Sequence, residues 1–176
     1  MTSTGKRLFI IYELEHLPQL QARLRAGEEL EVIALEYEVE LELKKRGIAY
    51  APLRSVAESC EGQREPIEVT RTAAKEWYKH PELAFFMHDG ILLGEPHAGP
   101  LHHYFGMLVY YLVLLEQIMA RPGVERVVLQ ETFHTVGERA DPTAYFKERV
   151  QVDVARMVAE RRGIAIEVIP APPAPA

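Results

Sequence analysis

The chain has 176 residues, of which 48% are hydrophobic and 26% are charged, and its formal net charge is -6. This composition is typical of a globular protein with a buried core and argues against intrinsic disorder. A net negative charge argues against binding to nucleic-acid phosphates or to an anionic membrane surface, because both need a basic face. We therefore expect no nucleic-acid partner.

The sequence also bears on redox chemistry and on compartment. Cys60 is the single cysteine, so the chain can form no internal disulfide and no cysteine-based zinc site. The apolar run Leu8–Tyr12 is too short for a signal peptide. The longest apolar run, Phe105–Leu115, is shorter than the about 20 residues that cross a bilayer. The sequence predicts a cytoplasmic protein with no membrane insertion.

Apolar runs alternate with amphipathic segments over the first 50 residues. Arg7–Tyr12 predicts a strand that is covered on both faces. A helix is expected from about residue 18 to residue 27, and Glu31–Leu35 predicts the second strand. Tyr37–Leu43 alternates as a strand does, but its Glu, Leu and Lys content and the way it ends favour a helix.

One helix-to-strand junction occurs twice in the chain. Residues 44–50 are Lys-Lys-Arg-Gly-Ile-Ala-Tyr, and residues 160–166 are Glu-Arg-Arg-Gly-Ile-Ala-Ile. Basic residues, then Gly, then an apolar run are typical of a helix that ends and leads into a buried strand. Two such junctions indicate two equivalent strand–helix units, as in a doubly wound parallel sheet.

The middle of the chain departs from this alternation. Residues 55–65 predict a surface loop, residues 66–79 a helix, and residues 83–93 a small hairpin with an Asp89-Gly90 turn. A helix that is apolar on nearly all sides is expected over about residues 100–120, buried at the centre of the domain.

The last third returns to strands and helices. Glu125–Leu129 predicts a strand, Asp141 and Pro142 open a helix that ends near residue 162, and residues 164–169 predict the last strand. Residues 170–176 contain only Pro and Ala and predict a linker-like tail. The expected fold is α/β. It consists of one Rossmann-like domain over residues 1–169, with a mostly parallel sheet of about five strands, helices on both faces and a small hairpin insertion.

Polar side chains follow several of the predicted strands. In an open parallel sheet, ligands bind beyond the carboxyl ends of the strands, near the point where the strand order reverses. The candidate binding residues selected by this rule are Glu13, His16, Glu36, Tyr37, Glu131, Thr132, His134 and Thr135.

With the strand order 3-2-1-4-5, four of these residues would face one crevice: Glu13, His16, Glu131 and His134. A carboxylate beside an imidazole can take a proton from an acceptor hydroxyl, so His134, Glu131 and His16 are the candidate catalytic residues. The alternative is that all of them are solvated strand-end residues without a chemical role.

The same sequence predicts no metal and no nucleotide cofactor. His102 and His103 are adjacent on an expected helix and point about 100° apart, which does not match a helical zinc pair. The first strand is followed by Glu-Leu-Glu-His in place of a glycine-rich phosphate loop. Carboxylates at that position repel a pyrophosphate.

Three tracts resemble a known family. Ala34–Tyr50 resembles the N-terminal half of bacterial glycosyltransferase-like proteins of surface-carbohydrate biosynthesis, and Leu129–Phe133 and Asp153–Arg156 are similar to the same domain. The order of elements fits that family from residue 6 to about residue 170. The resemblance implies the two-Rossmann-domain architecture called GT-B, in which the N-terminal half shapes the acceptor side and the C-terminal half holds the nucleotide sugar.

The chain would supply only the first of these halves. The resemblance therefore implies an acceptor-side domain in glycan assembly that is inactive alone. Its partners would be a carbohydrate acceptor and either a second GT-B half or another copy of the chain. The alternative is a non-catalytic small-molecule-binding or scaffold module. A third hypothesis, a small hydrolase or transferase that uses the Glu/His set, lacks a Ser or Cys nucleophile elbow.

Overall fold

The computed structural model describes residues 5–53, 98–131 and 142–171, and also residues 55, 72, 79, 81–82, 87–88 and 91–92. Residues 56–65 of the expected loop, nearly all of the expected helix over residues 66–79, and residues 172–176 of the tail lie outside this part of the chain. The elements in chain order are β1 (Lys6–Ile11), the 3-10 helix η1 (Leu14–His16), α1 (Leu17–Arg25), β2 (Glu31–Ala34), α2 (Tyr37–Lys45), β3 (Met87–His88), β4 (Ile91–Leu92), α5 (Ala98–Met119), β5 (Val124–Gln130), α6 (Pro142–Arg162) and β6 (Ala165–Ile169).

The main sheet has four strands in the order β2-β1-β5-β6, and every neighbouring pair is parallel. The predicted α/β class with a parallel sheet is confirmed. The strand order reverses between β1 and β5, because β2 lies on one side of β1 whereas β5 and β6 continue on the other. This reversal is the switch point of the sheet.

The expected number of about five strands is wrong, because the segment after α2 pairs at a single residue. Ala51 makes one parallel bridge to Ile33. In this bridge the Ala51 amide donates to the Val32 carbonyl, and the Ala34 amide donates to the Ala51 carbonyl. Pro52 has no amide hydrogen, and the next amide, that of Leu53, donates to the Glu40 carboxylate at 2.9 Å. The ladder therefore stops after one bridge.

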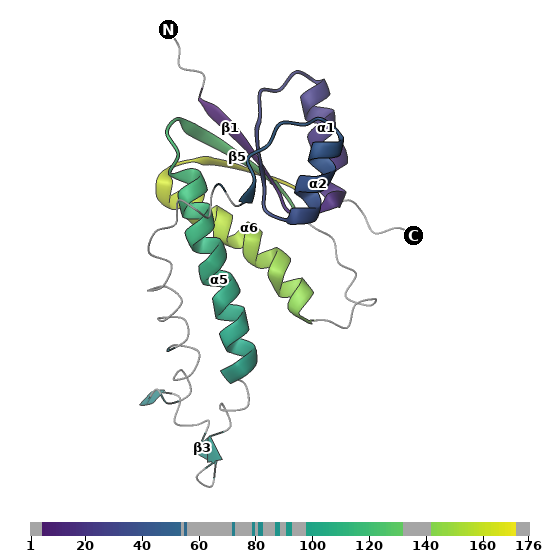
Figure 1. The fold of residues 1–176 in the computed structure, drawn as a ribbon. Coiled ribbons are helices and arrows are strands. Elements are labelled where there is room, and N and C mark those ends of the chain that lie inside the picture. Colours follow the sequence, from purple (N-terminus) through teal and green to yellow (C-terminus); the bar gives the residue numbers. More distant parts are fainter. Residues whose placement is uncertain are drawn as a thin grey trace.

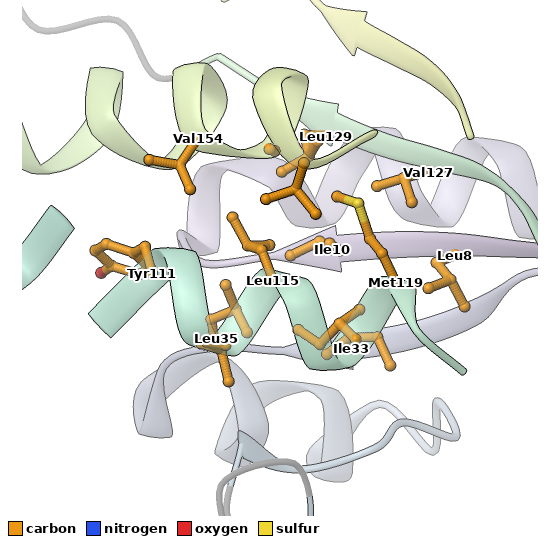
Figure 2. Packing of buried hydrophobic residues seen from close by; sticks show 14 of the residues in the cluster. Leu8, Ile10, Ile33, Leu35, Tyr111, Leu115, Met119, Val127, Leu129 and Val154 are labelled. Carbon is orange, nitrogen blue, oxygen red and sulfur yellow. The ribbon is translucent and has the colours of Figure 1, made fainter. Parts of the chain in front are cut away.

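Helices cover both faces of the sheet, with α1 and α2 on one side and α5 and α6 on the other (Figure 1). Successive side chains of a strand point to opposite faces, so Leu8 and Ile10 of β1 pack with α5 and α6, while Phe9 and Ile11 pack with α1 and α2. Figure 2 shows the first layer, in which Leu115 of α5 lies against β1. Because helices cover both faces of the sheet, the strand sequences are continuous apolar runs.

The expected central helix and the expected hairpin are both present. The second half of α5 buries one side, through Tyr111, Leu115, Ile118 and their neighbours, while Tyr110 is 42% exposed. This part of α5 is therefore buried on one side, whereas the sequence predicts a helix that is buried on nearly all sides. β3 and β4 pair antiparallel over two residues each, as expected for a hairpin here, and the predicted Asp89-Gly90 turn lies outside the described residues.

The repeated junction is confirmed in detail. Gly47 and Gly163 have φ values of +66° and +65°, the left-handed region that side chains disfavour. After α2, the Ile48 amide donates to the Leu43 carbonyl and the Gly47 amide to the Lys44 carbonyl. The same two bonds follow α6, where the residue after Gly163 donates to Ala159. These are Schellman motifs, which satisfy the last helical carbonyls.

Candidate functional site

A cavity of about 440 Å³ lies at the carboxyl ends of β1 and β2. Tyr12, Glu13 and Leu14 line it after β1, and residues 36–39 line it between β2 and the first turn of α2. Parallel strands end at the same edge of a sheet, so the segments that leave β1 and β2 meet there. Three residues selected from the sequence, Glu13, Glu36 and Tyr37, thus surround one cavity.

The start of α2 shapes one wall of the cavity. Glu36 has an extended backbone, with φ −132° and ψ 141°, and its side chain makes no capping hydrogen bond. The helix begins at Tyr37, and Glu38 lies in its first turn, where the helix dipole favours negative charge. Val39 is buried against the sheet, which fixes the helix in place.

The lining combines hydrogen-bond acceptors with apolar surface. Ionised carboxylates at Glu13, Glu36 and Glu38 accept hydrogen bonds from hydroxyl or N–H groups. Tyr37 is 71% exposed and Leu14 is 43% exposed, so both offer apolar surface to solvent beside these acceptors. An aromatic ring with polar neighbours suits a ligand that has an apolar face and a polar edge.

Tyr12 lies at the position where this kind of sheet usually binds ligands. Its hydroxyl donates to the main-chain carbonyl of Gln130, the last residue of β5, at 2.5 Å. The side chain of Tyr12 is 1% exposed and spans from the end of β1 to the end of β5. The cavity described above lies one strand away from the switch point, between the ends of β1 and β2.

His16 is in the protein interior and not in a solvent-filled crevice. It is 0% exposed, and its ring meets the ring of Tyr12 edge-on, with centroids 4.6 Å apart and an interplanar angle of 88°. Burial lowers the pKa of His16 to about 4, because the charged imidazolium is poorly solvated there. At neutral pH the ring is uncharged and does not line the cavity.

The remaining predicted residues lie after β5. The Glu131 amide donates to the Ile169 carbonyl at 2.8 Å, which extends the β5–β6 pairing, and its side chain is 3.6 Å from Arg156 in an ion pair. Glu131 is not among the residues that line the cavity. Thr132, His134 and Thr135 lie outside the described residues. The structure thus gathers Glu13 and Glu36, while His16 and Glu131 are placed elsewhere.

Tyr12 and Gln130 are joined by a hydrogen bond at the ends of β1 and β5, and neither residue is selected by the sequence pattern. Tyr12 occupies the first position after β1, where dinucleotide-binding proteins carry a glycine-rich turn. A large side chain at that position does not match the glycine-rich phosphate turn. Gln130 is a polar residue that ends the apolar run Val127–Leu129, and its burial becomes visible only once β5 is placed inside the sheet.

The described ranges contain neither a metal-ion cluster nor a helix suited to cross a membrane. No group of three or more His, Cys, Asp or Glu side chains in that part of the chain is arranged to hold a metal ion. Nor does any helix there combine the length and the hydropathy that a bilayer span requires.

Comparison with known proteins gives no match to any family model, curated protein or solved structure. The resemblance to glycosyltransferase-like proteins therefore stays a prediction from the sequence.

Proposed function

We propose that this chain is the acceptor-side domain of a GT-B-like glycosyltransferase and that its cavity between β1 and β2 binds hydroxyl groups of a carbohydrate acceptor. The observation that carries the proposal is the lining of the 440 Å³ cavity, which sets carboxylates beside the exposed ring of Tyr37. Sugars donate hydrogen bonds from hydroxyls and present apolar C–H faces to aromatic rings.

The same lining argues for an acceptor and against the nucleotide donor. A helix N-terminus in this fold commonly binds phosphate, but here Glu36 and Glu38 flank the start of α2. Their negative charges oppose a pyrophosphate. A nucleotide sugar would therefore be held by a second domain, and catalysis would take place only when both halves are present.

A non-catalytic binding module is the second candidate, and the burial of His16 favours it. An imidazole with a pKa of about 4 is a weak base at neutral pH and has no exposed surface toward a substrate. His16 therefore offers no general base to a ligand in the cavity, which favours binding without catalysis by this residue. Turnover of a nucleotide sugar by the chain together with a nucleotide-binding half would separate the two candidates.

Nuclear magnetic resonance of the 15N-labelled protein tests the proposed binding. Neutral methyl glycosides should shift the amide signals of residues 12–14 and 36–39, whereas uridine and guanosine diphosphates should leave them unchanged. Signals that respond only to the nucleotides, or to no glycoside, would contradict the proposal. The titration also gives the affinity.

A pair of variants links this affinity to the cavity. Glu36→Gln should weaken glycoside binding about tenfold or more, because a hydrogen bond to a charged acceptor is worth about 1.5–3 kcal/mol. Glu15→Gln is the matched control, since Glu15 is an exposed glutamate two residues from Glu13 that does not line the cavity. Equal losses in both variants would point to a general charge effect and not to recognition by Glu36.

A further inference from the structure

The outer face of α2 carries apolar side chains where a surface helix is usually polar. Residues 37–43 alternate apolar and acidic side chains with a period of two, but the segment folds as a helix with 3.6 residues per turn. Val39 and Leu43 are buried against the sheet. The other two apolar residues, Tyr37 and Leu41, therefore point away from the sheet and are 71% and 41% exposed. α2 thus presents a second apolar face to solvent (Figure 1).

Charged side chains flank this outer face, and their sign changes along the helix. Glu38 is exposed in the first turn of α2, and Lys44 and Lys45 are exposed in its last turn. Within the described part of the chain, neither Glu38 nor Lys44 has an ion-pair partner, and Lys45 forms an exposed pair with Glu42 at 3.3 Å. Exposed pairs of this kind contribute little to stability, so Lys45 can change partner at low cost. The face is therefore acidic at its N-terminal end and basic at its C-terminal end.

This arrangement of charges is complementary to itself. In a twofold dimer whose axis passes beside Leu41 and perpendicular to α2, the two copies of the helix lie antiparallel, and each first turn lies beside the partner's last turn. Successive residues of a helix are about 100° apart, so Glu38 and Lys45 lie on the same side of Leu41. Tyr37 and Lys44 lie together on its other side. On both sides, the antiparallel arrangement therefore sets an acidic or aromatic residue against a lysine of the partner.

We propose that a second copy of this chain binds the outer face of α2 and forms an antiparallel twofold dimer. Leu41 packs against the partner's Leu41 beside the axis. Glu38 pairs with the partner's Lys45, and the ring of Tyr37 packs against the ammonium group of the partner's Lys44. Because Tyr37 also lines the cavity, the partner's Lys44 comes to the rim of that cavity. Formation of the dimer does not depend on carbohydrate binding.

Sedimentation velocity of the whole chain tests the dimer. A contact between two helices of 9 residues is smaller than a standard interface of about 1,200–2,000 Å², so the mass should rise from monomer to dimer over micromolar to millimolar concentrations. Leu41→Ser should weaken dimerisation about tenfold or more, because the dimer loses the same apolar contact from both chains. Met157→Ser is the matched control, since Met157 is 43% exposed on α6 and should not affect the dimer. A wild-type chain that stays monomeric at every concentration would overturn the proposal.

Charge reversal identifies the surface that forms the dimer. Glu38→Lys and Lys45→Glu should each weaken dimerisation at least about tenfold, because each sets like charges against one another twice in the dimer. An equimolar mixture of the two variants should form a heterodimer, since one chain then presents only lysine and the other only glutamate at these two positions.

Recovery in the mixture also shows that both variants are folded. Glu160→Lys is the control, because it changes the net charge equally at an exposed position of α6 and should leave the dimer intact. A mixture that stays monomeric would overturn the antiparallel α2 interface. So would single variants that dimerise as the wild type does.

Discussion

The hydroxyl of Tyr12 and the main-chain carbonyl of Gln130 form a hydrogen bond of 2.5 Å between residues that are 118 positions apart in the sequence. The bond joins the segment that leaves β1 to the end of β5, where the strand order reverses. In related architectures a ligand occupies this place. Here the Tyr12 side chain reaches across this place, and the cavity seen among the described residues lies between the ends of β1 and β2.

Removal of this hydroxyl should lower stability by a measurable amount. Tyr12→Phe leaves the ring in place but deprives the carbonyl of Gln130 of its partner, and the expected loss is about 1–3 kcal/mol in the free energy of unfolding. Urea denaturation followed by circular dichroism measures it. Tyr37→Phe is the control, because Tyr37 is 71% exposed and its hydroxyl can bond to water in either state. Equal stability of the Tyr12 and Tyr37 variants would show that the bond contributes nothing.

Alanine should lower the stability of the protein at Gly47 and Gly163 and raise it at Gly106. Gly47 and Gly163 have positive φ, and a Cβ at either would meet no atom within 4 Å, so the cost of alanine is the backbone conformation itself. Each substitution should destabilise the protein by about 1–2 kcal/mol. Gly106 lies inside α5 with open space around its Cβ position, so Gly106→Ala should stabilise by about 0.5–1 kcal/mol. Thermal unfolding of the three variants checks this order, and a stabilising Gly47→Ala would contradict it.

These junction glycines also show how far the sequence determines the fold. Gly47 and Gly163 follow basic residues and precede apolar runs, and this local pattern is sufficient to predict where α2 and α6 end. The strand expected after Gly47 shows the limit of such local patterns. Its loss depends on the Leu53 amide, which bonds to Glu40, thirteen residues earlier, and no local pattern specifies that partner.

The site was less predictable than the fold, because it depends on which strand-end side chains turn inward. The rule for parallel sheets selects Glu13, Glu36 and Tyr37, and these three residues line the cavity. It does not distinguish them from His16, which follows the same strand but is 0% exposed. The difference arises from η1, whose tight turn brings His16 against Tyr12.

The ion pair between Arg23 and Glu167 should stabilise the edge of the sheet. Arg23 of α1 bonds to Glu167 of β6 and also to Glu28, and the bond to Glu167 is the main reason that the pKa of Arg23 is raised. Arg23→Met should lower the free energy of unfolding by about 1 kcal/mol at low salt and by less at high salt. Arg25→Met, an exposed position on the same helix, should change it little. A loss that is independent of salt would assign the effect to packing of the Arg23 stem.

His16 should make the protein less stable as the pH falls below neutrality. The pKa of His16 is about 4 in the folded protein and 6.5 as the unperturbed value, so between these pH values the unfolded chain binds more protons. The contribution of neutral His16 is complete above pH 6.5 and is lost as the pH falls toward 4, a change of about 3 kcal/mol. Carboxylates titrate in the lower part of this range, so the comparison needs a variant that removes only the imidazole.

The matching experiment compares wild type with His16→Asn, which has no titratable group at this position. Urea unfolding at several pH values between about 7 and 4 gives two curves, and the wild-type curve should fall more steeply, whatever the absolute stability of the variant. Parallel curves would contradict the burial of a neutral imidazole. The titration of labelled histidine carbons in the folded protein is an independent measurement. The His16 signal should keep its neutral chemical shift at pH values where exposed histidines are already charged, because its desolvated ring takes up a proton only when the pH approaches 4.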